Sequence, residues 1–323
     1  MELRQLFYEL MQVAVGQLDC LSRGPSPEEW QELYATAQRQ GVAGICYKGV
    51  ERLFEFGLRA PQDISIDWMS ETEAIRVNNA TYDKRSAIIQ KRLLERKIYT
   101  TILLGQGVAR YYGEELQELR QPKGIDVYVD CGLEKAIKFV QQTGQKEVRH
   151  NRHVVWLEAW EDCPTRILPQ LAYSKNPWRK EIQQRWFRQN REQLFMEEGD
   201  LVVPSEDMNV VYVLQHLYEQ FLYGQVDMRL LMDCFFILKK KAGSFGTYKN
   251  GMTVVKVLNS FGIGKFAQGV MWVMQEVFSL DRSLMPVEPL ESEGQFILHE
   301  VMTGRHLLQM VKHYPLQMIW KMF

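Results

Sequence analysis

The most constraining feature of this 323-residue sequence is a change of pattern near residue 99, where helical periodicity gives way to short β-type segments. Residues 64–97 contain neither Pro nor Gly, which predicts one long helix. Residues 99–104 and 125–129 are apolar and rich in β-branched side chains, as is typical of buried strands. From residue 176 onward the pattern is helical again. We therefore expect an α/β or α+β fold, with a small mixed sheet between two helical regions.

This change of pattern divides the chain into three segments. We expect an N-terminal helical segment at 1–98, an α/β core at 99–175 and a C-terminal helical region at 176–323. Hydrophobic residues make up 46% of the chain and aromatic residues 11%, which supplies a core and excludes disorder as the main state. The 39 Lys and Arg nearly balance the 40 Asp and Glu. That balance excludes nucleic-acid binding by bulk attraction and leaves only a local patch open.

Local signals set several element boundaries. Residues 26–29 read Ser-Pro-Glu-Glu, which predicts a helix start with a capping box. Ser205 and Asp227 are each predicted to cap a later helix. Residues 153–157 and 165–168 are two short apolar segments around an acidic turn, which predicts a β-hairpin.

The cysteine pattern and the hydropathy pattern together predict a cytoplasmic protein. The five cysteines are far apart and form no CxxC pair, so a zinc ribbon and a thioredoxin-type site are not supported. Isolated cysteines of this kind are typical of small core residues in a reducing compartment. The first residues lack the pattern of a signal peptide, and no apolar run approaches the roughly 20 residues of a membrane span.

The motifs that carry chemistry are concentrated between residues 103 and 129 and continue further along the chain. They comprise Gly105-Gln106-Gly107 after the first predicted strand, Tyr111-Tyr112, Leu119-Arg120, Lys123-Gly124-Ile125-Asp126, Asn176-Pro177-Trp178, and Arg229 followed by Asp233. In this order and spacing they resemble a bacterial family of uncharacterised nucleotidyltransferases within the polymerase-β-like superfamily. The resemblance covers most of residues 99–240.

The resemblance implies a protein that binds a nucleoside triphosphate with Mg²⁺ and transfers a nucleotidyl group to an acceptor, which the sequence does not identify. Small residues after a strand let backbone N–H groups approach a triphosphate. On this basis Gly105, Gln106 and Gly107 are predicted to contact phosphates. Arg120 or Lys123 is predicted to neutralise phosphate charge.

The carboxylates of this sequence depart from the family pattern. The first Asp of the family's Asp-x-Asp pair falls at Gly124, which leaves Asp126 as the predicted metal ligand and catalytic carboxylate. The third family carboxylate falls near Arg166, and Glu158 on the preceding strand is the predicted catalytic substitute. The family's lysine before the glycines falls at Leu104.

These departures leave two hypotheses for function. The first is a Mg²⁺-dependent nucleotidyltransferase. The second is a catalytically inactive relative that serves as a nucleotide-binding sensor or a protein-interaction scaffold. A single carboxylate holds Mg²⁺ weakly, because hard cations need several oxygen ligands, and this favours the second hypothesis. The retained glycine segment favours the first.

Two further regions have a structural and a functional interpretation. Trp178, Ile182 and Trp186 have helical spacing among many arginines, and a buried stripe with a solvated basic face is favoured over a nucleic-acid site. The segment at 306–323 has no acidic residue and is expected to dock onto the helical body rather than onto a membrane.

Three isolated polar features have simple structural interpretations. Arg229 and Asp233, at i and i+4, are predicted to pair along one helix. His216 on an apolar helix is predicted to be a core histidine rather than a ligand. His150 and His153 are predicted to form a polar entry to the hairpin, because their spacing suits two metal ligands only on a helix.

Overall fold

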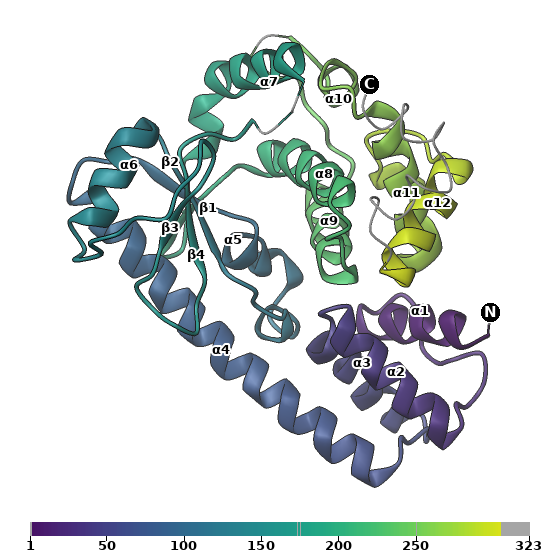
Figure 1. Ribbon diagram of the computed structural model, residues 1–323. Coiled ribbons are helices and arrows are strands. Elements are labelled where there is room, and N and C mark those ends of the chain that lie inside the picture. The colour runs from purple at the N-terminus through teal and green to yellow at the C-terminus, as the bar shows by residue number, and fades with distance from the viewer. Residues whose placement is uncertain (1, 173, 175, 250, 305–323) are drawn as a thin grey trace, which may run out of the picture.

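The computed structural model describes residues 2–172, 174, 176–249 and 251–304, and it confirms a small mixed sheet flanked by helical regions (Figure 1). The prediction for residues 306–323 lies outside this part of the chain. The N-terminal helices confirm the periodicity: they are α1 (Glu2–Ala14), α2 (Pro27–Arg39), α3 (Ala43–Glu55) and α4 (Gln62–Leu94).

The start of α2 forms as its sequence predicts. The Ser26 hydroxyl accepts a hydrogen bond from the Glu29 backbone N–H. The Glu29 carboxylate accepts one from the Ser26 N–H at 2.8 Å, which completes the capping box. Both bonds satisfy backbone donors that have no partner inside the helix.

The central sheet places two β-type segments side by side in parallel. Its strand order is β1, β2, β4, β3, with β1 antiparallel to β2, β2 parallel to β4, and β4 antiparallel to β3. The last pair is the predicted hairpin. The elements of this segment are β1 (Thr100–Leu103), α5 (Gly105–Ala109), the 3₁₀ turns η1 (Arg110–Tyr112) and η2 (Gln117–Leu119), β2 (Ile125–Val129), α6 (Gly132–Gln141), β3 (Val155–Leu157) and β4 (Thr165–Leu168).

Alternation along the strands gives the sheet two different faces. Ile125, Val127 and Val129 point into a hydrophobic cluster shared with α4 and α6. The opposite face carries Asp126 and Tyr128 and turns toward the larger cluster, which includes residues of the N-terminal and C-terminal helices. The polar residues of the sheet therefore lie on the side of the later helices.

The C-terminal region is mainly helical, with one exception that the sequence reading missed. The prediction of continuous helix from residue 176 is wrong at a short hairpin whose strands are three residues each, too short to show a clear alternation. The elements are α7 (Pro177–Gln189), η3 (Arg191–Leu194), β5 (Met196–Glu198), β6 (Leu201–Val203), α8 (Glu206–Leu222), α9 (Met228–Lys241), α10 (Val254–Ser260), α11 (Gly264–Phe278), η4 (Arg282–Leu284) and α12 (Glu291–Thr303). Ser205 and Asp227 cap α8 and α9 as predicted.

The long helix α4 connects the N-terminal helices to the sheet and packs on the sheet face that carries Ile125, Val127 and Val129 (Figure 1). Trp68 Nε1 donates to the Ala43 carbonyl of α3 at 2.8 Å. Gln90 exchanges two hydrogen bonds with the backbone of Val202 in β6, at 2.8 and 2.9 Å. These polar contacts fix the position of α4 more specifically than apolar packing alone, because each needs one geometry.

The prediction of a fully buried apolar stripe on α7 is wrong in its first turns. Trp186 is buried, but Trp178 is 81% exposed and Ile182 is 40% exposed. The first turn of α7 projects from the body, so only the C-terminal part of the stripe contacts the core.

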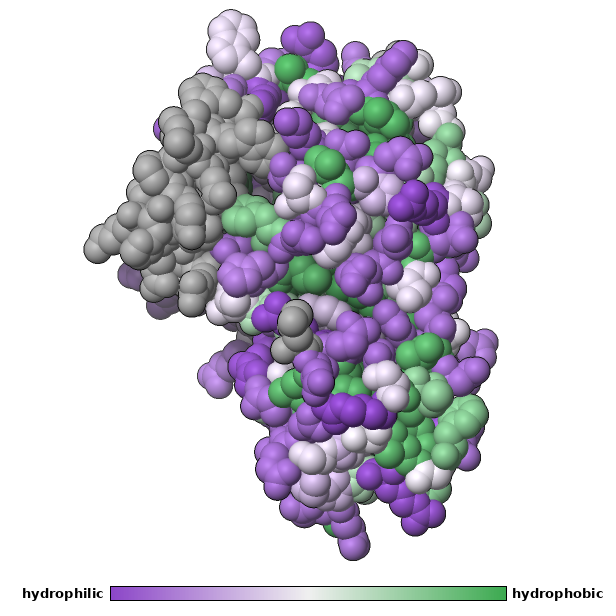
Figure 2. All heavy atoms as spheres, turned by 90° about the vertical axis from the view of Figure 1, so that its right-hand side faces the viewer, coloured by the Kyte–Doolittle hydropathy of each residue, from purple (hydrophilic) through white to green (hydrophobic). Residues whose placement is uncertain are grey.

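The face of the molecule shown in Figure 2 is mainly hydrophilic, with hydrophobic side chains in separate patches.

The state of the cysteines and the character of the helices can be compared with the predictions made from the sequence. All five cysteines lie within the described residues and are free thiols, and Cys46, Cys163 and Cys234 are buried as core residues. Within the same part of the chain, no helix combines the length and the apolar character that crossing a bilayer requires.

Candidate functional site at Asp126 and Arg166

The centre of the candidate site is an ion pair between neighbouring parallel strands. The register places Asp126 of β2 directly beside Arg166 of β4. Arg166 Nε donates to Asp126 Oδ1 at 2.6 Å and Nη2 donates to Oδ2 at 2.5 Å. Both carboxylate oxygens therefore face a guanidinium, in the bidentate geometry that makes such pairs strong. The Asp126 side chain is only 14% exposed, whereas that of Arg166 is 43% exposed.

The structure separates Glu158 from Asp126. Glu158 follows β3 and is exposed, and β4 lies between β3 and β2. Strands two positions apart lie about 9.6 Å apart, twice the normal spacing. Arg166, and not a second carboxylate, is the side chain next to Asp126.

The backbone at Gly124 is adapted to the absence of a side chain. A Cβ atom built on Gly124 lies 2.8 Å from the carbonyl oxygen of Pro164. That oxygen accepts the Ile125 N–H at 2.9 Å, the first hydrogen bond between β2 and β4. The close approach of the two strands at this point therefore requires glycine, and an Asp side chain cannot be placed at this position unless the backbone moves.

This close approach leads to a prediction about restoring the carboxylate. Gly124→Asp is expected to lower the free energy of unfolding by about 1–3 kcal/mol, the usual cost of overpacking a tight contact. Urea denaturation followed by circular dichroism measures it. Gly246→Asp is the matched control, because a Cβ at Gly246 meets open space. Equal stability of the two variants would show that the strands separate easily at Gly124.

The turn after β1 is strained and tightly packed. Leu104 has φ +46° and ψ −147°, a conformation that is favourable only for glycine, and Gly105 follows with φ +47°. A Cβ on Gly107 would lie 2.8 Å from the Ile102 carbonyl oxygen. The Gly107 N–H donates to the Leu104 carbonyl at 2.8 Å. Gly107 thus brings α5 against the end of β1, and its amide is already used.

The predicted phosphate ligand Gln106 turns away from the Asp126 pair. It is 3% exposed, and its side-chain amide donates to the Asn79 carbonyl at 3.3 Å and to Asp83 Oδ1 at 3.0 Å, both on α4. In this structure its side chain fixes the turn to α4.

Lys123 and Arg229 bring two more cations to this side of the molecule. Lys123, whose side chain is 70% exposed, lies 3.5 Å from Asp227 Oδ2. Arg229 Nη2 lies 3.2 Å from the same oxygen. Asp227 Oδ1 caps α9 by accepting the Leu230 N–H. The prediction that Arg229 pairs with Asp233 is therefore wrong, because the capping carboxylate is within closer reach.

Arg120 lies in the core, where it forms a buried ion pair with Asp233 of α9. Its Nε and Nη2 donate to Asp233 Oδ1 and Oδ2, each at 2.7 Å, and Tyr112 donates to Asp233 Oδ1 at 2.6 Å. The side chains of Arg120 and Asp233 are 2% and 0% exposed. Burial lowers the pKa of Arg120, but the contact with Asp233 outweighs burial and the net direction is upward. The structure thus directs Arg120 toward α9 and away from the surface.

His216 on α8 lies among the charges of this region. Burial lowers its pKa to about 4. The Asp126 carboxylate opposes this shift, while Arg166 and Arg229 add to it. His216 stacks on Tyr212 at a ring distance of 5.9 Å. It is neutral near pH 7, but it is half-buried rather than fully enclosed in the core. Its position beside the Asp126 pair had no signal in the sequence.

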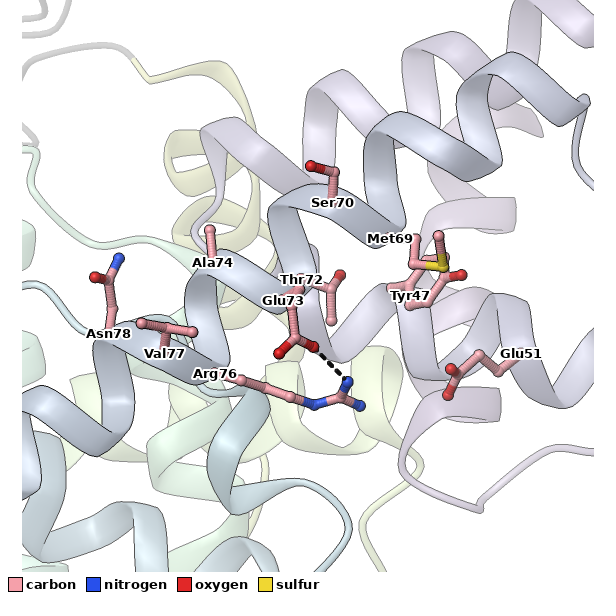
Figure 3. A pocket seen from close by; sticks show the side chains of 10 residues that line it. All are labelled: Tyr47, Glu51, Met69, Ser70, Thr72, Glu73, Ala74, Arg76, Val77 and Asn78. Atoms are coloured by element: carbon pink, nitrogen blue, oxygen red, sulfur yellow. Dashed lines mark hydrogen bonds and ion pairs between the residues drawn. The ribbon is translucent and has the colours of Figure 1, made fainter.

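A separate open hollow of about 720 Å³ lies between α3 and α4 (Figure 3). Tyr47 and Met69 lie close together at one side of it, and Glu73 and Arg76 form an ion pair at 3.1 Å within it. Its charged side chains along α4 thus neutralise each other, in contrast to the cations around Asp126.

With this geometry established, comparison with known proteins identifies the family. A protein-family model described as "Uncharacterised nucleotidyltransferase" matches residues 26–279. The chain belongs to this family. No curated protein and no solved structure gives a match. The match to the uncharacterised nucleotidyltransferases begins at the cap of α2 and ends after α11, so it includes the whole sheet and the candidate site.

The nucleotidyltransferase family implies a nucleotide ligand and a divalent metal, and the residues of this chain do not fit the metal. Among the residues that the structure describes, no group of three or more His, Cys, Asp or Glu side chains is arranged to hold a metal ion. Asp126 uses both oxygens on Arg166, and a Mg²⁺ ion beside that guanidinium would be repelled by its charge. The side chains around Asp126 therefore do not form a site that suits Mg²⁺.

Proposed function

We propose that this member of the uncharacterised nucleotidyltransferase family binds the phosphates of a nucleotide through fixed cations and acts as a nucleotide-binding sensor or scaffold rather than as a transferase. The observation that carries the proposal is the bidentate contact of Arg166 with Asp126, at the place where the family sequence has metal-binding carboxylates. A phosphate that approaches this pair meets the exposed part of Arg166.

The surrounding charges support the same proposal. Lys123, Arg166 and Arg229 are opposed by the carboxylates of Asp126 and Asp227, so within these five described side chains the cations exceed the carboxylates by one. The strained turn at Leu104 and Gly105 lies beside Gly124, at the start of β2. Strained turns of this kind are concentrated at ligand sites. Gly105, Lys123 and Arg166 are the residues that we assign to phosphate contact.

The direct test is the sign of the effect of Asp126→Asn on nucleotide binding. If cations hold the phosphates, removal of this competing carboxylate should tighten ATP or GTP binding by about three- to tenfold. If Asp126 holds Mg²⁺, the same substitution should abolish binding. Isothermal titration calorimetry of both nucleotides, first with Mg²⁺ and then with EDTA, measures the difference.

Two further variants complete this experiment. Glu158→Gln is the matched control, because it removes an exposed carboxylate of the same sheet, and we expect unchanged binding. Arg166→Gln should weaken binding about tenfold, the value of one charged phosphate contact. Binding that requires Mg²⁺ and is lost in both carboxylate variants would establish a catalytic metal site instead. Absence of binding by the unmodified protein would refute the nucleotide proposal altogether.

We also propose that the protein acts in the cytoplasm. The support is the set of five unpaired thiols, of which three are buried core residues, a pattern typical of a reducing compartment.

A further inference from the structure

An exposed tryptophan at the start of α7 requires an explanation. Trp178 is 81% exposed, although burial of a tryptophan is a large source of stability. Asn176 caps the helix by accepting the N–H groups of Trp178 and Arg179, which fixes the backbone of the first turn at Trp178. An exposed aromatic ring is a platform on which another flat ring can stack.

Two arginines follow this ring along the exposed side of α7. Arg185 and Arg188 follow Trp178 at helical spacing, with side chains 65% and 71% exposed. Glu181 lies 3.7 Å from Arg185 and 3.3 Å from Arg188, and it neutralises one of the two charges. This side of α7 therefore presents an aromatic ring and a net positive charge.

A second set of cations continues from α7 to the sheet along the residues that precede β3. Gln184 of α7 donates to Gln170, and Gln170 contacts Arg152 and His153 at 2.7 and 2.6 Å. Burial lowers the pKa of His153, and the neighbouring charges of Lys180 and Arg152 lower it further. The residues just before β3 and the first turns of α7 thus form one basic surface.

Strand β3 carries a second aromatic residue close to the candidate site at Asp126 and Arg166. The Arg149 guanidinium lies 4.6 Å from the ring centroid of Trp156. The register places Trp156 directly beside Arg166 on β4. Glu158, which follows β3, is an exposed acidic residue close to Trp156 in the sequence. One tryptophan on α7 and one on β3, each with arginines nearby, therefore lie on the way from α7 to the Asp126 pair.

We infer that a single-stranded nucleic acid binds along this surface, which we call the α7–hairpin surface. It comprises Trp178, Lys180, Arg185 and Arg188 on α7, together with Trp156 on β3 and Arg149 and Arg152 just before β3. Bases stack on exposed aromatic rings, and phosphates bind the cations between them. Binding of an acidic peptide requires the arginines but not the exposed aromatic rings between them. Binding to a membrane surface requires a larger apolar face than Trp178 and Ile182 provide. The inference does not depend on which ligand occupies the Asp126 site.

The test is fluorescence anisotropy with labelled 20-nucleotide oligo(dT) and oligo(U), titrated with the full chain from 50 to 200 mM salt. Trp178→Ala should weaken binding about tenfold with little change in the salt dependence, because stacking is not ionic. Arg185→Glu with Arg188→Glu should weaken binding at least tenfold and reduce the salt slope by about 1.4, the value of two lost phosphate contacts on a single strand. Both changes lie on exposed side chains, so the fold is retained.

The matched control reverses two lysines of the same spacing on another helix. Lys135→Glu with Lys138→Glu on α6 makes the same change of charge at i and i+3. Both lysines are exposed, and α6 packs against the sheet face that carries Val127 rather than against α7. Binding should change less than twofold. The inference is overturned if no oligonucleotide binds at 50 mM salt, or if the control loses as much affinity as the α7 variant. Equal competition by duplex DNA, polyglutamate or anionic phosphatidylglycerol vesicles would also overturn it, since stacking requires unpaired bases.

Discussion

Asp233→Asn is expected to lower the free energy of unfolding by about 3–5 kcal/mol, because it leaves the buried Arg120 guanidinium without its counter-charge. The pair is almost fully buried, and Tyr112 adds a third member by donating to the same carboxylate. The neutral amide still accepts from Tyr112, so the loss comes mainly from the unpaired charge. Urea denaturation at pH 7 measures the change.

Two comparisons separate this explanation from a general effect of the substitution. Asp130→Asn removes the partner of Arg191 in an ion pair whose side chains are 30% and 47% exposed, and it should cost less than about 1 kcal/mol. The double variant Arg120→Met with Asp233→Leu removes both charges at similar volume and should recover most of the lost stability. A cost for Asp233→Asn no greater than that of Asp130→Asn would show that the buried guanidinium finds other partners.

Acidification below pH 6.5 is expected to destabilise the protein through His216. Burial lowers the pKa of this histidine to about 4, whereas the unfolded chain has a pKa near 6.5. As the pH falls through 6.5, the unfolded chain takes up a proton that the folded chain refuses, so stability falls. The loss should reach about 2 kcal/mol at pH 5 and about 3 kcal/mol at pH 4, where the folded protein begins to protonate.

The variant His216→Gln should remove this loss, and the urea midpoint between pH 7.5 and 5 compares the two proteins. Carboxylates titrate mostly below this range, so the difference isolates the histidine. His150→Gln, at an exposed position of the hairpin, should keep the full pH dependence. If the unmodified protein and the His216 variant lost stability equally, water would have to reach the imidazole in the folded state.

The local chemistry of the sequence predicted most of the elements of the fold. The Pro-free and Gly-free stretch gave the long helix α4, the apolar β-branched residues gave β1 and β2, and the capping residues Ser26, Ser205 and Asp227 mark helix starts in the structure. Such features depend on neighbours within about four residues, and those neighbours are visible in the sequence. The hairpin of β5 and β6 was not predicted, because its strands are too short to show an alternating pattern.

Which side chains meet was decided by the tertiary structure. The sequence identified Gly124 and Arg166 as positions where this chain departs from its family and Asp126 as the carboxylate that it keeps. The register of β2 and β4 then joined Asp126 to Arg166. The sequence paired Asp233 with Arg229, four residues away, but the structure pairs it with Arg120, which is 113 residues distant along the chain. Local spacing favours the near partner. The buried carboxylate takes the distant one because only a guanidinium held inside the core satisfies both of its oxygens without exposure to water.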